Sequence, residues 1–375
     1  MIKHFVKLIA AVIAASSFTA SSVLAADIDY GKPGTPVKLV IGFQPYYTES
    51  WSGVVMKGKK FYEKYLPKGS QVEFQIGLQG AIIVNSMLAG KQHIGYMGDM
   101  PSIVSTTKVE TADVRIVATL GLGRDQCNIF LVRTDAPKFA SPKDAIKWLD
   151  GKQVAVPKGS CTDRFAQAAF KKEGVQPKDY LNQNIEVITS NFRAGKIDAA
   201  VIWEPTASRL VQEGLARRAA TGATVDEDDG AFLAMRADLI KQRPDVVNAW
   251  MNAELDAQLF LADPKNANEI IQLAKAETTG FSDRALWYAL YGSYPAAEGG
   301  TITKTRINLH YAITPAARAL IDKATTFLFS IKSINVEKLR PEAVMPEFAA
   351  AVLAERKLTA PIGRVAALPD EQAPK

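Results

Sequence analysis

The sequence has 375 residues, a formal net charge of +6 at pH 7 and 47% hydrophobic residues. A chain of this length has room for two domains of ordinary size, each with a substantial core. The charge excess is small, and basic runs interleaved with aromatic residues do not occur, which argues against a nucleic-acid partner. With only 3 His residues, a zinc site or a His-based nucleophile has almost nothing to build on.

Residues 1–26 have the layout of a secretory signal peptide rather than of a folded element. Lys3 and Lys7 give a positive start, 8–15 an apolar stretch, and 23–25 a cleavage site with small residues. A membrane anchor is the alternative, but serines interrupt the apolar stretch well before the roughly 20 residues that a spanning helix needs. We therefore expect a cleaved signal and a mature protein that is soluble outside the cytoplasmic membrane.

The first third of the chain alternates strands, turns and helices. Short apolar runs suit buried strands, and each is followed by a turn and an apolar-periodic helix. The expected strands are 37–42, 72–76, 93–96 and 115–120, and the expected helices are 50–65, 81–89 and one ending near 107. This alternation predicts a parallel α/β layer with helices on its faces.

A second series of the same kind begins near residue 128. Its expected strands are 129–133, 153–156, one near 180 and 199–203, and its expected helices are 142–149, 164–172 and 185–193. One α/β lobe is thus followed by another.

Beyond about residue 238 the pattern predicts helices only. The longest are 244–261, 267–276 and 315–329. A third domain is one interpretation; more economically, these helices return to cover the first lobe. The Pro- and Ala-rich end suggests a disordered tail. The expected organisation is a signal peptide at 1–26, lobe 1 at 27–123, lobe 2 at 124–230, the return to lobe 1 with C-terminal helices at 231–360, and a tail at 361–375.

Ligands of open α/β sheets bind at the carboxyl ends of the strands, where loops lead into helices. Four turns occupy such positions, at 44–50, 77–81, 98–102 and 159–163. Each brings free backbone N–H groups and a partial positive charge toward one place, which suits an oxyanion. Taken singly, each turn is better explained as a simple helix cap.

Several stretches together resemble a known family. They are residues 80–90, IGYMGDMP at 94–101, GKQVAVP at 151–157 with 160–162, and FRAGKIDAAVIWEP at 192–205. This combination is similar to the nitrate/sulfonate/taurine (NitT/TauT-type) group of ABC-transporter periplasmic substrate-binding proteins. The resemblance covers roughly 37–222.

The resemblance implies a two-lobed α/β clamshell of the periplasmic-binding-protein type, with a helical C-terminal extension. A small polar organic solute would lie between the lobes, and an ABC permease would recognise the closed form. Catalysis, a metal and a cofactor have no role in such a mechanism, and we expect a monomer. The family's cleft residues fall on Gln44, Tyr46, Tyr47, Thr48, Gly80, Ala81, Asp99, Met100, Ser160, Cys161, Thr162, Asn184, Trp203 and Glu204.

Asp99 departs from a pure anion site, because a carboxylate at a helix start competes with a bound anion for the same N–H groups. If Asp99 and Glu204 both face the cleft, a zwitterionic or heterocyclic nitrogen ligand is favoured over nitrate or a simple alkanesulfonate. The alternative is that Asp99 is an ordinary cap that points away.

Three further residues invite interpretation. Tyr46 and Tyr47 could form aromatic walls for a flat or partly apolar ligand. Arg124 lies at the expected crossing between the lobes and could supply a charge to the cleft, or it could merely pair with Asp125.

The only two cysteines are Cys127 and Cys161. An oxidising compartment favours pairing them in a disulfide, and the expected fold places both at the start of one lobe. The alternative is two unrelated small buried residues.

Other function classes fit less well. The fungal pyrimidine synthase of thiamine biosynthesis shares the clamshell fold, but it depends on a segment rich in Cys and His and on a cofactor-bearing lysine that this chain lacks. A hydrolase would need a triad that cannot be assembled around His93 or His310. A sensory solute-binding protein would use the same cleft and differ only in its partner.

Overall fold

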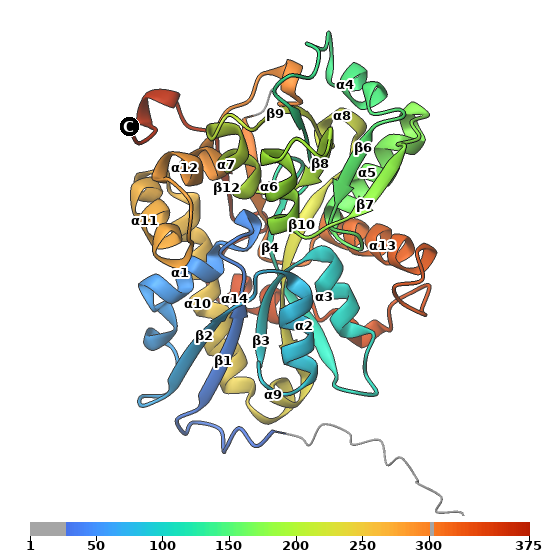
Figure 1. The fold of residues 1–375 in the computed structure, drawn as a ribbon. Coiled ribbons are helices and arrows are strands. Elements are labelled where there is room, and N and C mark those ends of the chain that lie inside the picture. Colours follow the sequence, from blue (N-terminus) through green and yellow to red (C-terminus); the bar gives the residue numbers. More distant parts are fainter. Residues whose placement is uncertain (1–27, 301–303) are drawn as a thin grey trace, which may run out of the picture.

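The computed structural model describes residues 28–300 and 304–375, which form two β-sheets covered by helices (Figure 1). The first sheet has 7 strands in the order β12-β11-β4-β10-β3-β1-β2, and the second has 5 in the order β7-β6-β8-β5-β9. The signal peptide expected at 1–26 lies outside the described residues. Among those described, no helix combines the length and the apolar character needed to cross a membrane.

The first sheet and its helices form lobe 1, most of which lies in the lower half of Figure 1. Its strands are β1 (Lys38–Phe43), β2 (Gln71–Ile76), β3 (Ile94–Gly98), β4 (Val114–Gly123), β10 (Asp229–Arg236), β11 (Thr305–Leu309) and β12 (Gly363–Ala366). Its helices are α1 (Ser52–Lys59), α2 (Gly80–Leu88), α3 (Asp99–Thr106), α9 (Ala237–Gln242), α10 (Pro244–Ala262), α11 (Ala267–Glu277), α12 (Asp283–Tyr291), α13 (Pro315–Ser330) and α14 (Glu347–Glu355).

The second sheet and its helices form lobe 2, the upper half of the same view. Its strands are β5 (Ile129–Arg133), β6 (Gln153–Val156), β7 (Asp179–Asn182), β8 (Ala199–Ile202) and β9 (Ala216–Thr221). Its helices are α4 (Pro142–Trp148), α5 (Cys161–Glu173), α6 (Ile185–Arg193), α7 (Thr206–Gln212) and the short α8 (Gly222–Val225).

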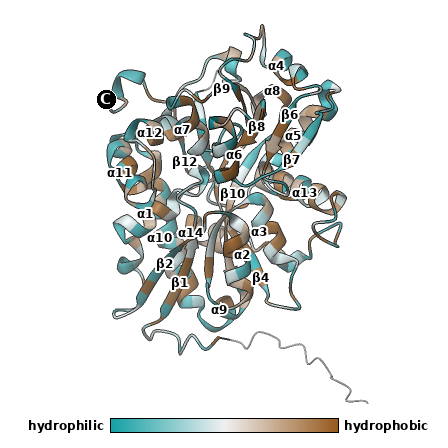
Figure 2. Cartoon of the chain, viewed as in Figure 1, coloured by the Kyte–Doolittle hydropathy of each residue, from teal (hydrophilic) through white to brown (hydrophobic). Residues whose placement is uncertain are grey.

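Strands in the middle of each sheet are apolar on both faces. Every residue of β3 and of β8 is buried, and Figure 2 shows brown, hydrophobic segments in strands of both sheets, such as β1 and β8. Burying such side chains contributes about 1.5–3 kcal/mol each, which is the main force that holds the helices on the sheets.

The chain crosses between the sheets twice, at 124–128 and at 222–228, which we call the crossing segments. They lie side by side, because the N–H of Gly222 donates to the carbonyls of Arg124 at 2.8 Å and Asn128 at 3.0 Å. A β-carbon at Gly222 would lie 2.1 Å from the carbonyl oxygen of Glu227, so only glycine fits this close approach. The two crossing segments therefore form one narrow hinge.

Three sequence expectations need correction. The sheets are mixed rather than parallel, since β10 pairs antiparallel with β3 and β4, and β5 pairs antiparallel with β8 and β9. β5 and β10 each follow a crossing segment, and each therefore runs opposite to the strands that it pairs with. The single helix expected at 50–65 is broken at Lys60, which has a left-handed φ of 54°.

The third correction concerns the C-terminal part. It is not purely helical, because β11 joins the first sheet, and 361–375 is not a disordered tail throughout. Residues of β12 pair antiparallel with β11 there. A partner strand supplied by the fold, rather than local sequence, orders this segment.

Candidate functional site

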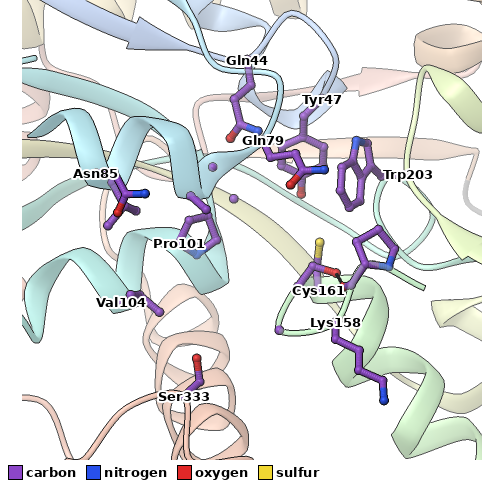
Figure 3. Close-up of a pocket in the computed structure, with 17 residues that line it drawn as sticks. Gln44, Tyr47, Gln79, Asn85, Pro101, Val104, Lys158, Cys161, Trp203 and Ser333 are labelled. Carbon is purple, nitrogen blue, oxygen red and sulfur yellow. Dashed lines mark hydrogen bonds between the residues drawn. The ribbon is translucent and has the colours of Figure 1, made fainter. Parts of the chain in front are cut away.

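A cavity of about 310 Å³ lies between the lobes (Figure 3). Lobe 1 lines it from the loop after β1, the start of α2 and the start of α3, and lobe 2 lines it from the start of α5 and from Trp203 after β8. Its volume lies at the lower end of the range typical of small-molecule sites. We call it the head compartment.

The start of α2 forms one wall of the head compartment. Gly80 and Ala81 line it, and their N–H groups belong to the first turn, where no intrahelical acceptor exists. A β-carbon at Gly80 would lie 2.3 Å from Cγ of Pro101 in α3. Glycine therefore allows α2 to start directly against α3 and to present its positive end to the cavity.

The start of α5 forms the facing wall, with Ser160 and Cys161. The Ser160 hydroxyl donates to the Pro157 carbonyl at 2.6 Å, which fixes the turn before the helix. Cys161 is bonded to Cys127 in a disulfide with a Cα–Cα distance of 6.1 Å. Since Cys127 belongs to the first crossing segment, the disulfide ties this wall to the hinge.

Neutral hydrogen-bonding side chains complete the lining. Gln44 is 4% exposed, and its Oε1 has no hydrogen-bond partner. Rotation of the Gln44 side-chain amide by half a turn would place its NH₂ group where Oε1 lies. The side chains of Gln79 and Asn85 form no hydrogen bond within the described residues, and Figure 3 shows Gln44, Gln79, Tyr47 and Trp203 gathered on one side of the cavity.

The electrostatic character of the cavity comes from helix ends and amides rather than from charged groups. Within the described part of the chain, no Asp or Glu lines it, and Lys158 is its one charged residue. The Lys158 Nζ lies 5.0 Å from the ring centroid of Tyr180, and its side chain points away from the other labelled groups in Figure 3. An uncharged, donor-rich wall of this kind suits an oxyanion.

A second cavity of about 240 Å³ adjoins the first and shares Gln79 and Trp203 with it. We call it the tail compartment. Its wall is mainly apolar, with Asn184, Glu186 and Thr206 as further polar members; the apolar residues are Tyr46, Leu78, Ile82, Ile185 and Trp203. Leu78 and Ile82 are 54% and 45% exposed, a costly state for large aliphatic side chains that an apolar ligand group would relieve.

Nine of the fifteen site residues expected from the sequence line these two compartments. Those in the head compartment are Gln44, Tyr47, Gly80, Ala81, Ser160, Cys161 and Trp203, and those in the tail compartment are Tyr46 and Asn184, with Trp203 in both.

Asp99 does not line either compartment. It is fully buried, its Oδ1 accepts the N–H of Met100 at 2.7 Å, and its Oδ2 accepts from Arg164 at 2.9 Å. Burial raises the pKa of Asp99, and the Arg164 charge opposes this. The carboxylate therefore accepts an N–H group from the first turn of its own helix and bridges the lobes instead of meeting a ligand.

Glu204 is also absent from the lining. It is fully buried and paired with Arg218, and it accepts the Ser208 N–H at 2.9 Å. The reason for favouring a cationic or zwitterionic ligand, two carboxylates in the cleft, is therefore removed.

The other four expected residues lie elsewhere. Arg124 is half-exposed and pairs with Asp226 and Asp228, not with Asp125. Thr48 is buried and donates to Gln126 at 2.5 Å, behind the wall. Met100 packs in the core of lobe 1, and the Thr162 hydroxyl bonds with Ser160 at 2.6 Å.

Sequence reasoning missed several lining residues. Val84 and Asn85 follow Ala81 by three and four positions, so helical periodicity could have placed them on the same face of α2. Ser333, which follows α13, gave no local signal, because only the return of the C-terminal chain brings it to the cavity.

Sequence comparison gives a matching protein family and a curated relative. The model of the NMT1-like family matches residues 32–275. A curated relative is the taurine-binding periplasmic protein of Escherichia coli (strain K12), 27% identical over 223 residues. That alignment covers 55% of this chain and 65% of the relative, so the chain spans a little less than two thirds of the relative's length.

Solved structures show the same fold at low sequence identity. The periplasmic aliphatic sulphonate binding protein SsuA from Escherichia coli is 19% identical, with a TM-score of 0.67 over 84% of this chain and 100% of that one. The desulfurization enzyme DSZB is 17% identical, with a TM-score of 0.61 over 85% and 99%. The fold thus occurs in binding proteins and in an enzyme.

Proposed function

Because this chain belongs to the NMT1-like family, we propose that it is a periplasmic substrate-binding protein that delivers a small organic sulfonate to an ABC importer. The observation that supports this most is the head compartment, where the starts of α2 and α5 face each other across a cavity whose described lining includes no carboxylate. A sulfonate carries three acceptor oxygens and one negative charge, which match the N–H groups and partial positive charges of two helix ends.

Binding without chemical conversion is part of this proposal. Among the described lining residues, Cys161 is held in a disulfide and cannot act as a thiolate. The Tyr47 hydroxyl donates a hydrogen bond to the buried Glu49. The Lys158 ammonium points away from the cavity. No side chain there is poised as nucleophile or general base, which distinguishes this cleft from a hydrolytic site.

The tail compartment refines the choice of ligand. We propose that the bound sulfonate carries an apolar group that packs on Leu78, Ile82 and Trp203. Taurine, named in the relative, carries an ammonium group instead, and Glu186 at the exposed start of α6 is the one carboxylate among the described residues around this compartment.

Calorimetric titration with a series of alkanesulfonates is expected to show one site per chain. Affinity should rise by up to about fourfold for each added methylene, because each buried CH₂ contributes about 0.8 kcal/mol, until the tail compartment is full. Propane-1-sulfonate should bind more tightly than taurine, which has the same number of non-hydrogen atoms.

The variant I82N provides the matched comparison, since it makes the exposed wall of the tail compartment polar. I82N should reduce the increase in affinity with alkyl length and leave the affinity for methanesulfonate nearly unchanged. Tighter binding of taurine than of propane-1-sulfonate, together with its loss in E186Q, would show that the tail compartment holds an ammonium group. Failure of every sulfonate to bind would remove the proposed function itself.

A further inference from the structure

Two buried carboxyl groups meet behind the head compartment, at the hinge. Glu49 follows Tyr47 in the loop after β1, Asp229 opens β10, and both are fully buried. Oε1 of Glu49 and Oδ1 of Asp229 have no hydrogen-bond partner. A β-carbon at Gly123 would lie 2.8 Å from the first oxygen and 3.0 Å from the second, so both oxygens approach the same point.

The other oxygen of each carboxyl group accepts hydrogen bonds. Oε2 of Glu49 accepts the hydroxyl of Tyr47, whose ring lines the head compartment. Oδ2 of Asp229 accepts three backbone N–H groups of the first crossing segment, from Gln126 at 3.2 Å, Cys127 at 2.7 Å and Asn128 at 2.9 Å. Three such donors stabilise the ionised form of Asp229, which leaves Glu49 as the holder of a proton.

The charged groups around this pair cannot replace that proton. Asp99 from α3 and Asp125 from the first crossing segment add negative charge nearby. The two neighbouring cations are already paired, Arg164 with Asp99 and Glu227, and Arg306 with Asp125. Two ionised carboxylates would therefore share a buried site that has no free counter-charge among the described residues, which is strongly unfavourable.

We propose that Glu49 and Asp229 share one proton at neutral pH, and that this pair joins the cleft wall to the hinge through Tyr47 on one side and the first crossing segment on the other. Removal of the proton places a second negative charge inside the hinge. Ligand affinity and stability are then expected to fall together as the pH rises.

The direction of the pH effect follows from proton binding. Burial, followed by the charge of Asp229, raises the pKa of Glu49 well above its usual 4.5, and burial raises the pKa of Asp229 to about 6. Above pH 4.5 the unfolded chain releases a proton that the folded chain keeps. The stability contributed by this proton is thus full below that pH and is lost as the pH rises through the raised values.

Glu49→Gln tests the proposal in the absence of ligand. The amide is neutral at all pH values, can donate to Asp229 and can accept from Tyr47. Between pH 5 and 8, the unfolding equilibrium constant of the unmodified protein should rise relative to that of E49Q by up to about tenfold per pH unit. At pH 7 the infrared spectrum of the unmodified protein should contain a carboxylic-acid C=O band that E49Q lacks.

Glu254 supplies the control. It is another buried acid, in α10, which accepts the Tyr96 hydroxyl at 2.8 Å and has a pKa raised to about 7 by burial. E254Q should remove its own band and leave the Glu49 band, so the Glu49 band stays measurable even if E49Q folds poorly. Absence of any carboxylic-acid band from E254Q at pH 7, or equal pH dependence of E49Q and the unmodified protein, would overturn the shared proton. Neither readout requires a sulfonate, so failure here is separable from failure of the proposed function.

Discussion

Replacement of Arg164 by methionine is expected to lower the free energy of unfolding by about 3–5 kcal/mol, the usual cost of leaving a buried charge without its partner. Arg164 in α5 is 3% exposed and contacts Asp99 in α3, which is 0% exposed, so the pair joins the two lobes directly beside the head compartment. Arg164 also contacts Glu227, in the second crossing segment (222–228), at 2.9 Å. Chemical denaturation at pH 7 measures the loss.

Sulfonate affinity should fall in the same variant, because the Asp99 carboxylate, which follows the lining residue Gly98, becomes uncompensated and repels an anion. The double variant D99N/R164M removes that charge and should recover part of both losses. D99N alone leaves Arg164 with Glu227 and should be the mildest of the three. If R164M and the double variant are equally unstable, lost packing of the arginine rather than the ion pair is responsible.

Replacement of Ala81 by phenylalanine is expected to weaken sulfonate binding by about 100-fold, or about 2.7 kcal/mol. Ala81 is an exposed residue in the first turn of α2, and it lines the head compartment. An aromatic ring there would occupy a large share of a cavity of about 310 Å³ without disturbing a packed core. Titration calorimetry gives the affinity, and thermal unfolding verifies the fold.

Ala89 offers the matched control. It is exposed at the C-terminal end of the same helix and does not line the cavity. A89F therefore makes the same chemical change with the same modest effect on stability, about 0.5 kcal/mol for a surface site, and should bind sulfonate normally. Equal affinities of A81F and A89F would place the ligand outside the head compartment.

Local sequence patterns were sufficient to predict the parts of the site that are formed by turns at helix starts. A strand, a glycine-containing turn and a helix in succession predict where a helix start will lie, and Gly80, Ala81, Ser160 and Cys161 do line the cavity. This works because helix starts sit at the carboxyl ends of strands whatever the rest of the chain does. The two lobes follow from the same alternation.

The direction of a polar side chain at such a turn could not be predicted. Asp99 faces away from the cleft because its partner Arg164 lies 65 residues further along the chain, and Glu204 turns inward toward Arg218, 14 residues away. These partners belong to neighbouring elements of the fold, and no local pattern shows them. Ser333 and β12 were missed for the same reason, since tertiary contacts bring them to their places.

A crystal structure of the protein with hexane-1-sulfonate tests most directly whether the gap between the lobes holds an organic anion. The sulfonate oxygens should lie within hydrogen-bond distance of the N–H groups of Gly80 or Ala81 on one side and of Cys161 on the other, with the alkyl chain on Ile82. A sulfonate bound at another surface while this gap stays empty would contradict the assignment.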